Sequence, residues 1–236
     1  MPSLTAAELL DVWERGQGQP PAQKALWLLA AAGPGVAPAD FLRLPIGQRD
    51  AALLTLREWL FGPVLECVAA CPQCGEQLEL NFSTTDVRCE SPPEQELNVA
   101  LAEQTLRLRL PNSADLLAIA ACADSHTAQQ MLMARCVING DDGIFDDTVR
   151  QAMAARLAEA DPQADVQLAL TCPACGQTWT TTFDIVTFLW SEITAWAGRL
   201  FREVHLLASA YGWREADILA LNPSRRQRYL ALAQSV

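Results

Sequence analysis

Apolar positions in the first 62 residues recur at spacings of three and four, which predicts amphipathic helices. Thr5 and Glu8 have the spacing of a capping box and mark the start of the first helix. Gly62 followed by proline ends the last helix of this region. The expected helices cover about residues 5–15, 20–32, 40–44 and 47–61, and together they form an N-terminal helical region, residues 1–62.

Short alternating runs follow, and these are typical of strands. Residues 64–70 and 77–82 flank the sequence CPQCG, which predicts a strand, a tight turn and a second strand. An acidic, proline-containing loop is expected at residues 90–96. A second hairpin is expected at residues 97–101 and 105–110, where leucines alternate with arginines, so one of its faces would contact water.

Helical spacing returns after this hairpin, and Ser113 is expected to cap the first of three helices. The stretch from Asn139 to Asp147 is rich in Asp and Gly and superficially fits a calcium-binding loop. Such a loop needs a carboxylate at its twelfth position, which here is Arg150, so we interpret it as a solvated turn. The three expected helices cover residues 114–123, 131–137 and 147–160, the last capped by Asp146 or Asp147.

A second strand-like region, residues 165–183, precedes a long amphipathic helix that begins after Asp184 and ends at Gly212. Two short helices are expected at residues 213–221 and 223–233. The predicted fold class is α+β. The predicted parts are a helical region (residues 1–62), a split hairpin region (residues 63–184) that contains an insertion (residues 90–160), and a C-terminal helical region (residues 185–236).

The two CPxCG segments form an internal repeat. In both copies a phenylalanine, Phe82 or Phe183, lies eleven residues after the first cysteine. The glycine permits the positive φ of a tight turn, and backbone N–H groups of such a turn can bond sulfur. Two such turns supply the four thiolates of a tetrahedral structural zinc site. We therefore predict a split zinc ribbon with one structural Zn²⁺, bound by Cys71, Cys74, Cys172 and Cys175.

Other interpretations of these cysteines are unrelated free thiols and a redox-active CxxC pair. Two identical turns argue against the first, and neither CPxCG opens a helix after a parallel strand, as the second requires. Four protein thiolates leave no open coordination position, so the zinc would be structural and not catalytic. The other cysteines are expected to be small buried apolar residues, with accessory ligation or redox sensing as alternatives: Cys67, Cys89, Cys122 and Cys136.

The chain of 236 residues has 17 basic and 28 acidic residues, a net charge of -11. This charge argues against binding to a nucleic-acid backbone, which depends on a positive surface. The N-terminal residues show no signal-peptide pattern, and no apolar run approaches the roughly 20 residues of a membrane span. We therefore expect a cytoplasmic protein whose eight cysteines are thiols or metal ligands rather than disulfides.

An enzymatic function is not expected, because neither His126 nor His205 lies in a catalytic motif and no GxxxxGK phosphate loop is present. Six arginines against three acidic residues lie between Arg199 and Arg228, among aromatic residues. Arginine with aromatics is compatible with nucleic acid, but the interspersed acids favour a protein-docking surface or a solvated face. The candidate partner-binding residues are Tyr211, Trp213, Arg225, Arg226 and Tyr229.

The sequence LPIGQRDAALL at residues 44–54, followed by Leu56-Arg57, Phe61-Gly62 and the CPQCG turn, resembles the T-even phage baseplate family. These are baseplate hub assembly proteins, with related forms in gene clusters of phage tail-like contractile injection systems. The resemblance continues through residues 106–115, and residues 211–230 look like the C-terminal module of tail assembly proteins.

This resemblance implies a non-enzymatic factor that assembles, or forms part of, the baseplate hub of a contractile tail. Its partners would be a baseplate hub, spike or tail-tube protein, and it would act in the cytoplasm or within the particle. The alternative from another class is a zinc-ribbon nucleic-acid-binding or transcription adaptor protein.

Overall fold

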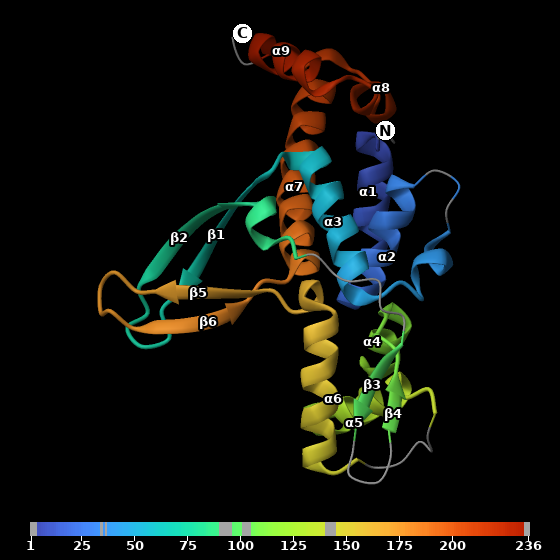
Figure 1. Ribbon diagram of the computed structural model, residues 1–236. Coiled ribbons are helices and arrows are strands. Elements are labelled where there is room, and N and C mark those ends of the chain that lie inside the picture. Colours follow the sequence, from blue (N-terminus) through green and yellow to red (C-terminus); the bar gives the residue numbers. More distant parts are fainter. Residues whose placement is uncertain are drawn as a thin grey trace.

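The computed structural model describes residues 4–33, 35, 37–89, 96–100, 105–139 and 145–233. A long helix, α7, forms the axis of the molecule, and three N-terminal helices pack along it (Figure 1). Two hairpins project to one side, an insertion lies at one end of the axis, and two short helices lie at the other (Figure 1). The helices of this body and of its C-terminal end are α1 (Ala6–Arg15), α2 (Pro21–Ala32), α3 (Ile46–Phe61), α7 (Ile185–Tyr211), α8 (Glu215–Leu219) and α9 (Pro223–Ala233).

The helical body is built on a continuous apolar core, in which Leu28, Leu53, Leu189 and Ile193 are fully buried. The predicted capping box of α1 is confirmed, because the Glu8 N–H donates to the Thr5 hydroxyl and the Thr5 N–H donates to the Glu8 carboxylate. The short helix expected at residues 40–44 is instead a 3-10 turn, η1 (Pro38–Phe41), which starts where Pro38 fixes the backbone. No helix in the described part of the chain is both long and apolar enough to cross a membrane.

The two hairpins have the same construction. Strands β1 (Val64–Ala70) and β2 (Gln77–Ser83) pair antiparallel, as do β5 (Gln167–Thr171) and β6 (Thr178–Thr182). Each hairpin is a separate two-stranded sheet with a CPxCG turn at its tip. At their bases the two phenylalanines of the repeat, Phe82 and Phe183, meet edge to face with ring centroids 5.7 Å apart. The sequence repeat is therefore also a structural repeat.

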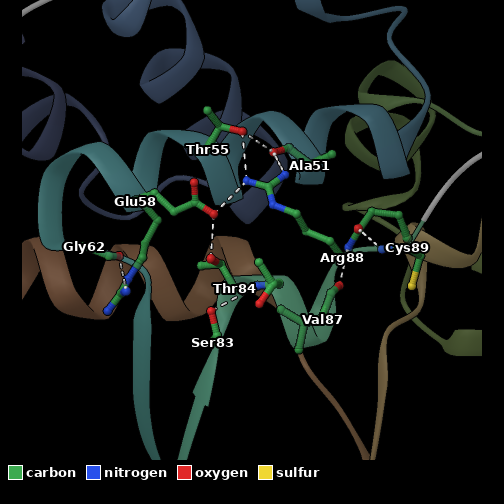
Figure 2. A network of polar contacts seen from close by, with 12 residues as sticks. Ala51, Thr55, Glu58, Gly62, Ser83, Thr84, Val87, Arg88 and Cys89 are labelled. Atoms are coloured by element: carbon green, nitrogen blue, oxygen red, sulfur yellow. Dashed lines mark hydrogen bonds and ion pairs between the residues drawn. The ribbon is translucent and has the colours of Figure 1, made fainter.

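A polar network fixes the first hairpin to α3 (Figure 2). The Glu58 carboxylate accepts hydrogen bonds from the Thr84 hydroxyl at 2.5 Å and from Arg88 at 3.0 Å. Arg88 also donates to the Thr55 hydroxyl and to the Ala51 carbonyl. The Thr84 hydrogen bond is the main cause that lowers the pKa of Glu58, and Arg88 adds to it. The turn that follows β2, η2 (Thr84–Val87), is thereby held against the body.

The insertion has its own core, which contains Leu97, Leu108, Cys136 and Met153, all fully buried. The predicted hairpin is confirmed, with its leucines inside. Residues 90–95 of the expected loop at 90–96, and part of the turn after Asn139, lie outside the described residues. The elements of this part are β3 (Leu97–Ala100), β4 (Thr105–Leu108), α4 (Ser113–Ile119), α5 (Ser125–Cys136), α6 (Asp147–Ala160) and η3 (Pro162–Ala164).

Helix boundaries in the insertion differ from the predicted ones. The N-cap of α4 is Asn112, not Ser113, because the Asn112 side chain accepts from the Asp115 N–H while the Asp115 carboxylate accepts from the Asn112 N–H. The second helix begins after Asp124, which caps it, and not near residue 131. Asp146 caps α6 as predicted.

The GQRD motif of α3 lies at the junction between the body and the insertion. The Gly47 N–H donates to the Asp161 carboxylate at 2.9 Å, and a Cβ at Gly47 would lie 1.8 Å from an oxygen of Asp161. Only glycine lets the backbone at position 47 come this close to the Asp161 carboxylate. Arg49 and Asp50 form a buried ion pair at 2.7 Å, and Arg49 also contacts the Ser113 hydroxyl of α4. The motif therefore joins two parts of the chain.

Candidate metal centre

The four cysteines of the two CPxCG turns meet at the tips of the hairpins, and their Sγ atoms all lie within 4.8 Å of one another. The first cysteine of each turn lies beside the second cysteine of the other turn. Cys71 and Cys175 are 3.7 Å apart between sulfurs, and Cys74 and Cys172 are 3.6 Å apart. Sulfurs bound to one zinc ion at about 2.3 Å in a tetrahedron are about 3.8 Å apart. These distances therefore fit a tetrahedral site.

The two turns have the same backbone geometry. The Cys71 N–H donates to the Glu76 carbonyl at 2.8 Å, and the Gly75 N–H donates to the Cys71 carbonyl at 2.9 Å. The second turn repeats both bonds at the same distances, from Cys172 and Gly176. The two glycines have φ values of 76° and 73°, in the left-handed region that glycine adopts without strain. The sequence thus produces one half-site at each hairpin tip.

Backbone N–H groups around the turns stabilise negative sulfur. Burial opposes ionisation of Cys71, but N–H groups of Cys74 and Gln73 outweigh it, with help from neighbouring thiols, and lower the pKa of Cys71 to about 7. The Glu76 N–H favours the thiolate of Cys74, yet Cys175, burial and Cys172 together raise the pKa of Cys74 to about 12. Cysteines bind a metal as thiolates, so a cation bound at this cluster would displace the protons of these thiols.

The donor set is made of sulfur alone. Cys71 and Cys172 are buried, while Cys74 and Cys175 are exposed at the outer side of the cluster. Within the described residues, this is the one group of three or more potential metal ligands. Thiolate ligands suit zinc and other soft metal ions. The arrangement is compatible with a metal site, and four protein ligands would leave no position for a substrate.

A comparison with protein families bears on the chain around the first half-site. Residues 35–146 match the family model described as T4 bacteriophage base plate protein. This segment belongs to the T4-type phage baseplate protein family. No curated protein and no solved structure matches the chain.

The baseplate-family segment includes α3 with its GQRD motif, the first hairpin with Cys71 and Cys74, and the insertion through α5. The second half-site, with Cys172 and Cys175, and the axial helix α7 lie beyond the match. The cysteine cluster therefore connects the baseplate-family segment to the part of the chain that follows it.

The remaining cysteines are less uniformly buried than the sequence suggested. Cys136 is fully buried, and burial raises its pKa to about 12. Cys67, Cys89 and Cys122 are only half-buried, so the prediction of four buried residues is wrong for these three. In the described structure, the four lie outside the cluster of sulfurs.

The predicted partner-binding aromatics lie together at the C-terminal end. Tyr211 stacks on Trp213 with centroids 4.8 Å apart, and Trp213 meets Tyr229 edge to face at 4.8 Å. Trp213 and Tyr229 pack against Leu207, Ile218 and Leu230 in a small core that holds α8 and α9 on α7. Tyr211 is partly exposed, so this cluster is at once a packing unit and part of the surface.

The two predicted arginines differ in their surroundings. Arg225 is exposed and lies over the Tyr229 ring at 5.8 Å. Arg226 is 4% exposed, forms an ion pair with Glu203 at 2.5 Å and donates to the Leu221 carbonyl. The structure therefore corrects the prediction for Arg226, whose guanidinium holds α9 on α7 and does not lie on an open surface.

Proposed function

We propose that the protein is a non-enzymatic structural or assembly factor of the baseplate hub in a contractile, phage tail-like particle. The family match over residues 35–146 carries this proposal, because the match is to a phage base plate protein. The function would be exerted through contacts with a hub, spike or tail-tube protein, in the cytoplasm or within the particle. The all-sulfur cluster supports a structural rather than a catalytic role.

We further propose that one structural zinc ion joins the two hairpins through Cys71, Cys74, Cys172 and Cys175. The sulfur separations of 3.6 and 3.7 Å support zinc, since both are close to the spacing in a tetrahedral zinc site. The metal would connect residues on both sides of the insertion and so fix the hairpins relative to each other.

The C-terminal end is the proposed contact surface. Arg225 and Arg228 are exposed on α9 beside the aromatic cluster, and neither forms an ion pair within the described part of the chain. Arginine beside aromatic rings is common at protein interfaces. The basic end of an acidic chain is complementary to an acidic partner surface.

Co-expression with the hub, spike and tube proteins encoded by neighbouring genes tests the proposal. We expect the full chain to co-purify with one of them and to contain one zinc per chain by elemental analysis. The double variant Arg225→Glu, Arg228→Glu should lose the partner and keep zinc, whereas Cys172→Ser should lose zinc. Arg43→Glu, which reverses the charge of one exposed arginine outside the C-terminal helices, is the charge-reversal control and should keep both the partner and zinc.

Absence of zinc in freshly purified protein would refute the metal site. Failure to co-purify with any of the three proteins would refute the hub assignment. The exposed arginines also favour one second candidate, a zinc-ribbon nucleic-acid-binding or transcription adaptor. Salt-dependent binding to DNA or RNA that the double variant abolishes would support that candidate instead.

A further inference from the structure

An apolar groove of about 1260 Å³ lies between the start of α1, the end of α3, α7 and α8. Its lining includes Leu60, Phe61, Trp196 and Leu219, and Trp59 is 50% exposed there. The groove exceeds the roughly 300–1,000 Å³ of small-molecule pockets. A half-exposed tryptophan beside apolar side chains is typical of an anchor point for a protein partner.

Positive charge borders this groove. Arg199 of α7 and Arg214, before α8, are exposed and line it, and their guanidinium groups have no ion-pair partner within the described residues. Glu215 is the one acidic residue in the lining, while Arg226 is already paired with Glu203. The chain as a whole carries -11, so this basic border is complementary to an acidic partner and unfavourable for a basic one.

The walls of the groove favour a helical partner. They are formed mainly by helices, whose backbone groups bond within each helix, so the groove offers no strand edge to an extended peptide. A helix satisfies its own backbone groups and needs only an apolar stripe to enter such a groove.

We propose that this groove binds an acidic amphipathic helix of a baseplate partner. The apolar stripe of that helix would pack on Trp59, and its flanking carboxylates would pair with Arg199 and Arg214. This inference rests on the proposed function and extends it, because it assigns a second contact region, on the α1–α3–α8 side, with a defined partner chemistry.

Fluorescence anisotropy on the full-length, zinc-loaded chain tests the inference with two labelled peptides of about 18 residues, which span about 27 Å as helices. One carries leucines at spacings of three and four with glutamates between them, and the other has lysine at every glutamate. We expect the acidic peptide to bind, and the basic peptide to bind at least about tenfold more weakly.

Variants then locate the binding site. Trp59→Ala should weaken the acidic peptide at least about tenfold by removing the anchor. Ala7→Trp, an exposed α1 position in the lining, should weaken it similarly by filling the groove without removing any existing contact. Arg43→Glu and Val68→Ala, an exposed apolar residue of β1, are the matched controls and should bind like the wild type.

The proposal is overturned if the acidic peptide does not bind, if both peptides bind equally, or if Trp59→Ala and Ala7→Trp bind like the wild type. It is also overturned if the wild type dimerises and Trp59→Ala does not, since a second copy then fills the groove. Peptide binding at the groove without any hub, spike or tube co-purification would support the groove and refute the hub assignment. Co-purification without peptide binding would support the hub assignment and refute the groove as a binding site.

Discussion

At the scale of single residues, Asp50 shows how a buried charge is held at the junction between body and insertion. Its carboxylate is 8% exposed and accepts a hydrogen bond from the Arg49 Nε at 2.7 Å. Burial outweighs the attraction of Arg49, and together with the nearby Asp184 and Asp161 it raises the pKa of Asp50 to about 6. Between about pH 4 and pH 6, the Asp50 carboxyl therefore keeps its proton in the folded chain and has lost it in the unfolded chain.

This shift predicts an unusual pH dependence. The unfolded value is near 3.8, so between that pH and about 6 the folded state binds more protons, and its stability rises as the pH falls. From about pH 7.5 to about pH 5, the free energy of unfolding of the wild type should rise by about 1 kcal/mol relative to Asp50→Asn. Urea unfolding followed by tryptophan fluorescence at both pH values measures this, and a difference that does not change with pH would contradict it.

At the scale of elements, the β4–α4 connection depends on one fully buried carboxylate. Asp115 accepts hydrogen bonds from Arg109 at 2.6 Å and Arg135 at 2.8 Å, and it completes the capping box with Asn112. Burial opposes its charge, but these hydrogen bonds outweigh that effect and lower the pKa of Asp115. One side chain thus links the segment that follows β4 with α4 and α5.

Removing this carboxylate should destabilise the insertion. Asp115→Ala leaves Arg109 and Arg135 without their ion-pair partner and removes the Asp115 half of the capping box, and we expect a loss of about 3 kcal/mol in the free energy of unfolding. Glu96→Ala removes the partner of Arg107 in an exposed ion pair and should cost less than about 1 kcal/mol. Denaturant titration compares them, and equal losses would show that Asp115 has no special role.

Elements were predictable from the sequence where their signals are local. The capping box of α1, the CPxCG turns and the end of α7 at Gly212 depend on residues within a few positions of one another. The cap of α4 was missed because Asn112 and Ser113 are both good cap residues, and the choice depends on the burial of Asp115. Burial of Arg226 was also missed, because its partner Glu203 lies on another helix.

The cysteine cluster could be predicted from local sequence signals, whereas the groove beside α8 could not. The repeat predicted which four cysteines meet, because each CPxCG turn supplies two of the four thiolates that a tetrahedral zinc site needs. The groove beside α8 was not predictable, because Trp59 reads as one more apolar residue of an amphipathic helix until the position of α8 is known.

At the scale of the whole molecule, the hairpins depend on each other. Each is an isolated two-stranded sheet, which is marginally stable alone, and the two meet at the phenylalanine pair and at the four sulfurs. The helical body has a large core, which the bases of the hairpins enter through Leu65, Phe82 and Phe183, whereas the hairpin tips lie outside it. Loss of a bound metal should therefore affect the hairpins first.

Limited proteolysis with and without a chelator tests this expectation. Chelation should speed cleavage within residues 64–83 and 167–182 by about tenfold or more, because local unfolding of the hairpins becomes easier. The helical signal in circular dichroism should change little. Cys122→Ser, outside the cluster, should respond to the chelator like the wild type. Equal cleavage rates with and without chelator would show that the sulfurs do not hold the hairpins together.

The separation of the two half-sites also sets an order in time. In a nascent chain still attached to the ribosome, 97 further residues are added after Cys74 before Cys172 is made. At about 5–20 residues per second this takes roughly 5 to 20 s, long enough for the insertion to fold first. The four-sulfur cluster can close only on a chain whose middle part has been completed, so a truncated product would carry half a site and could be recognised as unfinished.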